Sequence, residues 1–198
     1  MKITYLAHST FLLENNEGGR LITDPVDKGS GYDLHQVKAD VITVSHHHFD
    51  HDAIDQISGS PVVFDTPEIF EACGFKITGF PAFHDEVKGA KRGTNILFRI
   101  EADGKTVVHL GDLGHFPVKE QIKALSNADV LLIPVGGVYT IDGPQAAELA
   151  AVLSPKTVVP MHFSTPELTF KLNPLADFLK EAALLPVTVL SSGESFSL

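Results

Sequence analysis

Residues 45–51 read Ser-His-His-His-Phe-Asp-His and directly follow the apolar, β-branched run Val41–Val44. In an extended segment, residues two apart point to the same side, so His46 and His48 can reach one metal ion while His47 points away. A turn into a following short helix would bring Asp50 and His51 round to a second ion, and carboxylate and imidazole are usual catalytic ligands. The segment therefore predicts two adjacent half-sites for metal.

One loop leaves both ions under-coordinated, so further ligands must come from rigid strand ends elsewhere. Three candidates each follow an apolar run directly: His84 after Ile77–Phe83, Asp112 after Thr106–Gly111 and His162 after Thr157–Met161. Because the carboxyl ends of strands gather at one edge of an α/β sheet, these side chains are expected to converge. We expect one ion on His46, His48 and His84, the other on Asp50, His51 and His162, and Asp112 as the bridge.

Such a centre predicts hydrolysis without a serine or cysteine nucleophile. A water shared by two divalent ions has its pKa lowered to about 7, which gives a metal-bridging hydroxide at neutral pH. Asp50 is placed to accept or orient the proton. Imidazole and carboxylate accept zinc, manganese and iron alike, and zinc is the expected metal.

Composition limits the remaining possibilities. A chain of 198 residues with 43% hydrophobic content is enough for one core, so residues 1–198 are expected to form a single domain. A formal net charge of −10 disfavours nucleic acid as a partner, although bound cations would still admit a small anionic substrate.

The N-terminus and the single cysteine indicate in which cellular compartment the protein is expected. The opening MKITYLAHSTFLLE interrupts its apolar residues at once, which predicts neither a signal peptide nor a membrane span. Cys73 is the one cysteine of the chain; it excludes an intramolecular disulfide and is expected to be a buried small apolar residue. We expect a cytoplasmic protein without a membrane partner.

Short apolar runs and helical patterns alternate along the chain, which predicts an α/β layered fold. The pattern does not separate a doubly wound sheet from two sheets sandwiched between helices. Four helices are expected, over residues 66–74, 117–126, 144–153 and 173–184. The expected strands are Ile3–Leu6, Leu21–Thr23, Val41–Val44, Pro61–Phe64, Asn95–Ile100, Thr106–Leu110, Val130–Val135, Thr157–Met161 and Val187–Leu190.

The order His-x-His-x-Asp-His (His46, His48, Asp50, His51), then His84, Asp112 and His162, resembles the metallo-β-lactamase superfamily over nearly the whole chain. The resemblance implies a four-layer αββα sandwich of two mixed β-sheets flanked by helices. Within the superfamily, Asp24-Pro25 and residues 160–163 (Pro-Met-His-Phe) look like the branch that contains ascorbate-phosphate lactonases. Asp112 stands where true β-lactamases carry a cysteine ligand, which disfavours antibiotic hydrolysis.

Several residues around the predicted centre keep two interpretations. His8 either lies near the site, as a catalytic or substrate-contacting residue, or merely ends the first strand. His8, His115 and Tyr139 are candidates for protonating the leaving group, with a structural role as the alternative. Arg92, Asn95 and Tyr139 are the candidate substrate contacts, and a solvated surface residue is the alternative interpretation of Arg92. His35 and His109 are interpreted as ordinary polar residues.

Three functions are consistent with this pattern. Hydrolysis of a small ester, lactone or thioester is the first expectation, and phosphodiester or phospholipid hydrolysis is the alternative, since the same two-metal centre serves both. A non-catalytic metal-binding or sensing protein is the alternative of another class, although an open set of His and Asp ligands favours catalysis. A small-molecule substrate is the expected partner, and a homo-oligomer is expected on frequency alone.

Overall fold

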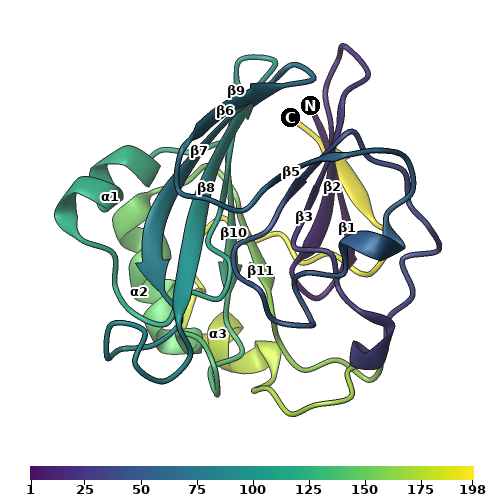
Figure 1. Cartoon of the computed structure of the whole chain (residues 1–198). Helices are drawn as coiled ribbons and strands as arrows, with labels where there is room; N and C mark the ends of the chain where they lie inside the picture. Colours follow the sequence, from purple (N-terminus) through teal and green to yellow (C-terminus); the bar gives the residue numbers. More distant parts are fainter.

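The computed structural model describes residues 1–198 and consists of two six-stranded sheets that face each other (Figure 1). The first sheet has the order β12-β1-β2-β3-β4-β5 and the second β11-β10-β9-β8-β7-β6. The strands of the first sheet are β1 (Lys2–Ala7), β2 (Thr10–Glu14), β3 (Arg20–Thr23), β4 (Val41–Thr43), β5 (Val62–Phe64) and β12 (Ser195–Ser197). Those of the second are β6 (Ile69–Ala72), β7 (Phe75–Phe83), β8 (Thr94–Ala102), β9 (Lys105–His109), β10 (Val130–Pro134) and β11 (Val158–Met161).

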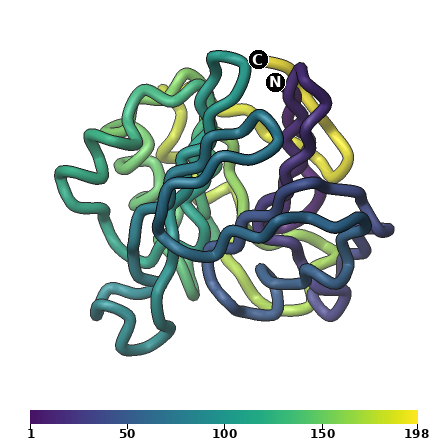
Figure 2. The backbone as a smooth tube through the Cα atoms, turned by 45° about the horizontal axis from the view of Figure 1, so that its top comes forward, coloured from purple at the N-terminus to yellow at the C-terminus, as the bar shows by residue number.

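Both sheets are mixed, and their strand directions decide where loops meet. In the first sheet β12, β1, β2 and β3 pair antiparallel, whereas β3, β4 and β5 pair parallel. In the second sheet β6 to β9 pair antiparallel in succession, whereas β9, β10 and β11 pair parallel. Strands β1, β3 and β4 therefore run in one direction within their sheet, and so do β7, β9 and β11 within theirs. Figure 2 shows the first and last segments of the chain side by side, where β1 pairs with β12.

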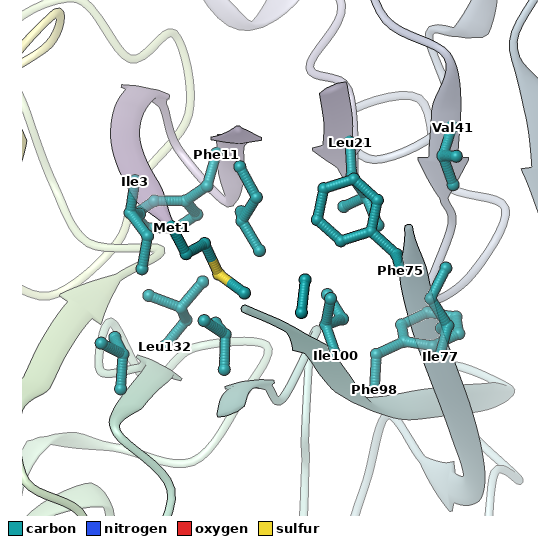
Figure 3. Close-up of a cluster of buried hydrophobic side chains, with 14 of the residues drawn as sticks. Met1, Ile3, Phe11, Leu21, Val41, Phe75, Ile77, Phe98, Ile100 and Leu132 are labelled. Carbon is teal, nitrogen blue, oxygen red and sulfur yellow. The ribbon is translucent and has the colours of Figure 1, made fainter. Parts of the chain in front are cut away.

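The core between the sheets is built from apolar side chains of both. Phe11 and Leu21 of the first sheet belong to the same buried cluster as Phe75, Phe98 and Ile100 of the second (Figure 3). Each is at most 1% exposed. Full burial of such a side chain contributes about 1.5–3 kcal/mol, so this cluster holds the two sheets together and fixes how their edges meet.

Three helices cover the outer face of the second sheet: α1 (Lys119–Leu125), α2 (Gly143–Leu153) and α3 (Leu175–Glu181) (Figure 1). Leu149 of α2 and Phe178 of α3 pack in one buried cluster with Leu131 and Ile133 of β10. Helix α2 begins at a capping box, in which Asp142 accepts a hydrogen bond from the backbone of Gln145 (3.0 Å). These are the three helices expected after residue 117.

The outer face of the first sheet is covered by loops and by two short 3₁₀ turns, η1 (Lys28–Ser30) and η2 (Ile54–Gln56). Val26, Leu34 and Ile57 from this layer pack against Ile22 and Ile42 of the sheet. The expected sandwich of two mixed sheets is confirmed, with this layer as its fourth. No helix has the length and apolar character needed to cross a membrane.

The helix expected over residues 66–74 is wrong, because this segment forms β6 and a tight hairpin into β7. Ala72 pairs with Phe75, so the loop holds only Cys73 and Gly74, both at positive φ (51° and 79°). Two such residues are what a type I′ hairpin turn requires. Cys73 is consequently exposed at the turn, which corrects the expectation that it is buried.

The strand expected over Val187–Leu190 is also wrong. Only Val187 bridges to the sheet, opposite Val158, and no regular ladder follows. The hydrogen bonds run from Val158 N to Pro186 O and from Thr188 N to Val158 O, both 2.9 Å long. Strands β2, β6, β7 and β12 were not among the expected strands.

Candidate metal centre

Every predicted ligand lies at the carboxyl end of a strand, and the sandwich brings these ends together. His46, His48, Asp50 and His51 follow β4, and His8 follows β1 in the same sheet. His84, Asp112 and His162 follow β7, β9 and β11 in the other sheet. The strands that carry ligands run in one direction within each sheet, so their loops meet at one edge of the sandwich.

The expected ligand atoms form two groups, and a third candidate group joins Asp24 to His46 and His51, one imidazole from each. In the first, one ring nitrogen from each of His46, His48 and His84 lies within 4.8 Å of the others. In the second, atoms of His8, Asp50, His51 and His162 lie within the same limit. The structure thus brings together each set of three residues expected for one ion, and it adds His8 to the second set.

Asp112 lies between the two groups and contacts both. Its Oδ2 is 3.2 Å from His84 Nε2 and 3.1 Å from His162 Nε2. Its Oδ1 is 3.2 Å from His51 Nε2. One carboxylate therefore faces nitrogen atoms of both sets, which is the position that a bridging ligand needs.

The donor set fits divalent metal ions. Buried atoms without a hydrogen-bond partner include Nε2 of His8, His46, His51 and His162, and Oδ1 of Asp112. An unsatisfied buried polar group costs about 1–3 kcal/mol, so five such atoms among the ligand residues are unfavourable unless a further group binds them. Imidazole and carboxylate together are ligands for zinc, manganese or iron.

Asp24 orients two of the imidazoles, one directly and the other through Ser45. Its Oδ2 accepts hydrogen bonds from His51 Nδ1 (2.9 Å) and the Ser45 hydroxyl (2.5 Å), and its Oδ1 accepts one from the Ser45 backbone (2.7 Å). The Ser45 hydroxyl accepts in turn from His46 Nδ1 at 3.0 Å. When a metal ion is bound and both rings are neutral, Nδ1 keeps its proton and Nε2 is the ligand atom, which is the tautomer that a metal ligand requires.

Asn95 positions Asp112. Its fully buried amide donates to the carbonyl of Leu110 (3.0 Å) and accepts from the backbone N–H of Asp112 (2.9 Å). Gly111, between these two, has a φ of 52°, and a Cβ there would lie 2.4 Å from Asn95 Oδ1. Because both ends of the amide are used, Asn95 is corrected from a substrate contact to a support for Asp112.

Burial and neighbouring charges set the protonation of the cluster. Burial, with the charge of His162, lowers the pKa of His8 to about 4, and burial beside His51 lowers the pKa of His46 to about 3. Burial opposes ionisation of Asp112, but the charges of His162 and His51 hold its pKa well below the ordinary value. At neutral pH the rings of His8 and His46 are therefore neutral and Asp112 is ionised, as metal binding demands. Burial opposes the charge of His51, but Asp112 and Asp24 hold its pKa well above the ordinary value, so His51 must lose a proton when metal binds.

A cavity of about 360 Å³ opens onto the cluster. Arg92 and Tyr139, both predicted as substrate contacts, lie on its wall, with the guanidinium carbon 5.4 Å from the ring centroid of Tyr139. Sequence reasoning missed two further wall residues, Phe49 and Phe170. The other lining residues are His48, Asp50, His84 and Asp112.

His115 and His109 have structural roles. Nε2 of His115 accepts from the backbone of Phe83 (3.1 Å) and its Nδ1 donates to Phe116 O (2.7 Å), so neither nitrogen is free for a substrate. His109 is fully buried and joins Ser9 O (2.9 Å) to the backbone N–H of Gly111 (3.1 Å). His35 is exposed, as expected for an ordinary polar residue.

Known proteins share this sequence and fold. Residues 2–162 match the family described as a Beta-lactamase superfamily domain. A relative from Pelotomaculum thermopropionicum, named UPF0173 metal-dependent hydrolase, is 33% identical, with 100% of each chain covered. A solved structure from Thermotoga maritima, proposed to be a zinc-dependent hydrolase of the metallo-β-lactamase superfamily, has a TM-score of 0.75 and 41% identity over 90% of this chain and 84% of its own.

A second solved structure, the metallo hydrolase Igni18 from Ignicoccus hospitalis, has a TM-score of 0.72 and 26% identity over 100% of this chain and 98% of its own. Fold and site together define a metal-dependent hydrolase of the metallo-β-lactamase superfamily, so the resemblance found in the sequence is confirmed. Within that superfamily the chain belongs to the UPF0173 family of metal-dependent hydrolases.

Proposed function

We propose that the chain is a two-metal hydrolase, with zinc as its metal, that cleaves a small carboxylic ester, lactone or thioester. The observation that carries the proposal is the position of Asp112, within 3.2 Å of nitrogen atoms from both ligand groups. Three protein ligands and a shared carboxylate at each ion leave room for water. When bound, two divalent ions supply an acidified water as nucleophile and polarise the substrate oxygen.

In this proposal Asp50 and His8 accept or orient the proton of the attacking water. Asp50 lines the cavity, and its Oδ2 lies 3.3 Å from His8 Nε2. Burial opposes its ionisation, but the nearby imidazoles of His8 and His51 hold the pKa of Asp50 below the ordinary value. An ionised carboxylate at the cavity wall can accept or orient a proton of the attacking water, and His8 can share it.

Arg92 and Tyr139 orient the substrate. Asp85 holds the Arg92 loop rigidly, because its carboxylate accepts the backbone N–H groups of Val87, Gly89, Lys91 and Arg92 at 2.8–2.9 Å. Arg92 also donates from Nη2 to Val138 O at 3.2 Å, next to Tyr139. A fixed guanidinium on the wall is the observation that favours a phosphodiester as the second substrate class, since it can form two parallel hydrogen bonds to a phosphate.

A substrate panel tests this proposal. A p-nitrophenyl ester, a lactone, a thioester and bis-p-nitrophenyl phosphate are offered to the protein as purified, after chelation, and after zinc or manganese is restored. We expect acyl substrates to be cleaved, with activity lost on chelation and recovered with metal. Turnover of bis-p-nitrophenyl phosphate alone would favour the second class, and metal-loaded protein that cleaves nothing would favour a metal-binding or sensing role.

Asp112→Ala and Asp129→Ala form the matched pair for this assay. Asp129 pairs with Lys156 (2.8 Å) outside the site, so its loss is expected to leave turnover unchanged. Loss of Asp112 removes the carboxylate that faces both ligand groups, and turnover is expected to disappear. Equal activity in the two variants would refute the proposed centre.

We also propose a small-molecule substrate and a cytoplasmic location, without nucleic-acid or membrane partners. The support is the formal net charge of −10, which repels phosphate backbones, and the single cysteine, which suits a reducing compartment. Fractionation of source cells checks the location. Sedimentation of the purified protein checks the expected homo-oligomer.

A further inference from the structure

The cavity wall beyond the ligand residues carries three aromatic rings from three separate loops. Phe49, Tyr139 and Phe170 all line the opening. The ring centroid of Phe170 lies 6.0 Å from that of Phe49 and 6.2 Å from that of Tyr139, at interplanar angles of 71° and 64°. Phe49 and Tyr139 are 60% and 38% exposed. Large aromatic rings that are exposed to solvent around a concave site indicate a surface that an apolar ligand group covers on binding.

Phe170 is held in place by its neighbours in the chain. Thr169 donates its backbone N–H to Ser30 O (3.2 Å) and its hydroxyl to Gly29 O (2.8 Å), which fastens the 163–174 loop to η1. On its inner side the Phe170 ring lies edge-on to the imidazole of His8, with 5.6 Å between centroids. The ring therefore contacts both the ligand cluster and the cavity.

Tyr139 is held at the cavity wall by Arg92, whose guanidinium carbon is 5.4 Å from its ring centroid. The backbone N–H of Arg92 donates to Asp85 (2.8 Å), and its guanidinium donates to Val138 O (3.2 Å). Rings whose positions are fixed before binding lose little conformational entropy when a ligand packs against them, so they contribute efficiently to affinity.

We propose that Phe49, Tyr139 and Phe170 form a binding site for an apolar, ring-sized group that is attached close to the scissile acyl bond of the substrate. The proposal rests on the hydrolase function above, which places the acyl group at the metal cluster. A carboxylic acid released by such a reaction would keep its carboxylate at the metals and its apolar group among the three rings. The cavity of about 360 Å³ falls within the range usual for small-molecule sites.

Phenylacetate and acetate test this proposal by binding alone. The chain has no tryptophan, so Phe170→Trp introduces a single indole at the opening whose fluorescence reports binding without turnover. The dissociation constants for wild type, Phe170→Ala and a control are measured by calorimetry on zinc-loaded protein. The control is Phe116→Ala, because Phe116 is 38% exposed and lies outside the cavity wall.

We expect phenylacetate to bind wild type and the control about tenfold more tightly than acetate does, because packing of the added ring against fixed aromatic rings is favourable. In Phe170→Ala this advantage falls to about twofold, while the affinity for acetate is unchanged, since only the ring contact is lost. Quenching or a spectral shift in Phe170→Trp with phenylacetate, but not with acetate, is the expected optical result.

Two outcomes overturn the proposal, and they are distinguishable. If acetate binds and esters are cleaved, but phenylacetate has no advantage or keeps its advantage in Phe170→Ala, the aromatic site is refuted and the hydrolase function stands. If neither acid binds the zinc-loaded protein and no ester is cleaved, both proposals fall together.

Discussion

Asp24→Asn changes the hydrogen bonds that support the proposed metal ligands and replaces none of these ligands. The carboxylate of Asp24 accepts three hydrogen bonds, from the Ser45 backbone, the Ser45 hydroxyl and His51 Nδ1, at 2.7, 2.5 and 2.9 Å. An asparagine amide has one oxygen and one NH₂ group, so when the oxygen stays on the Ser45 backbone the NH₂ group faces His51 Nδ1. Two donors then oppose each other. His51 is expected to move its proton to Nε2, the atom that faces Asp112.

The size of the effect follows from this geometry. Loss of a partner that orients a metal-bound histidine lowers metal affinity by about 10–100-fold. The lost charge-assisted hydrogen bond lowers the free energy of unfolding of the metal-free protein by about 1.5–3 kcal/mol. Asp24 is fully buried, so water does not replace the lost partner.

Competition with a chromophoric zinc chelator measures the affinity, and urea unfolding measures the stability. Asp129→Asn is the control, because that carboxylate accepts from the backbone of Thr106 (2.9 Å) and from Lys156 Nζ (2.8 Å) outside the cluster. The control is expected to lose stability and keep its zinc affinity. A folded Asp24→Asn protein that holds zinc as tightly as wild type would refute the role assigned to Asp24.

Three further predictions concern stability. Asn95→Leu leaves the buried Leu110 carbonyl and the buried Asp112 N–H without partners. The substitution is expected to lower the free energy of unfolding by about 2–4 kcal/mol, measured in urea. An unchanged midpoint of the urea transition would contradict this. Asp142→Ala removes the cap of α2 and is expected to cost about 1 kcal/mol by the same assay, with metal content unchanged. Burial opposes ionisation of Asp129, but Lys156 holds the pKa of this carboxyl below the ordinary value. The stabilising effect of the ionised carboxylate is therefore present above the unfolded pKa of about 3.9 and is lost as the pH falls through the folded pKa. The stability difference between wild type and Asp129→Asn should therefore shrink below about pH 4, and a constant difference between neutral and acid pH would refute this.

The ligand cluster could be predicted because each ligand is marked by local sequence. His84, Asp112 and His162 each end an apolar run, and strand direction then determines that they meet. The same rule applied to Ala7-His8 and Thr23-Asp24 would have placed His8 in the cluster and Asp24 beneath it. Their signal was present in the sequence, since each directly follows a β-strand.

The aromatic wall could not be predicted in this way. Phe170 lies in a loop that Thr169 binds to η1, more than a hundred residues earlier in the chain, and no local sequence pattern indicates such a contact. The prediction of a helix over residues 66–74 failed for a related reason. Thr66-Pro67 and Gly74 resemble helix ends, whereas the pairing of β6 with β7 and of β7 with β8 determines the structure.

Metal content per chain, measured by elemental analysis on reconstituted tag-free protein, tests the central claim most directly. Wild type is expected to hold about two divalent ions, as a two-metal hydrolase requires. His84→Ala and His162→Ala each remove a ligand from one group only, so each folded variant is expected to retain about one ion. Wild type that binds no metal, or a single ion that either substitution abolishes, would contradict the two-ion centre.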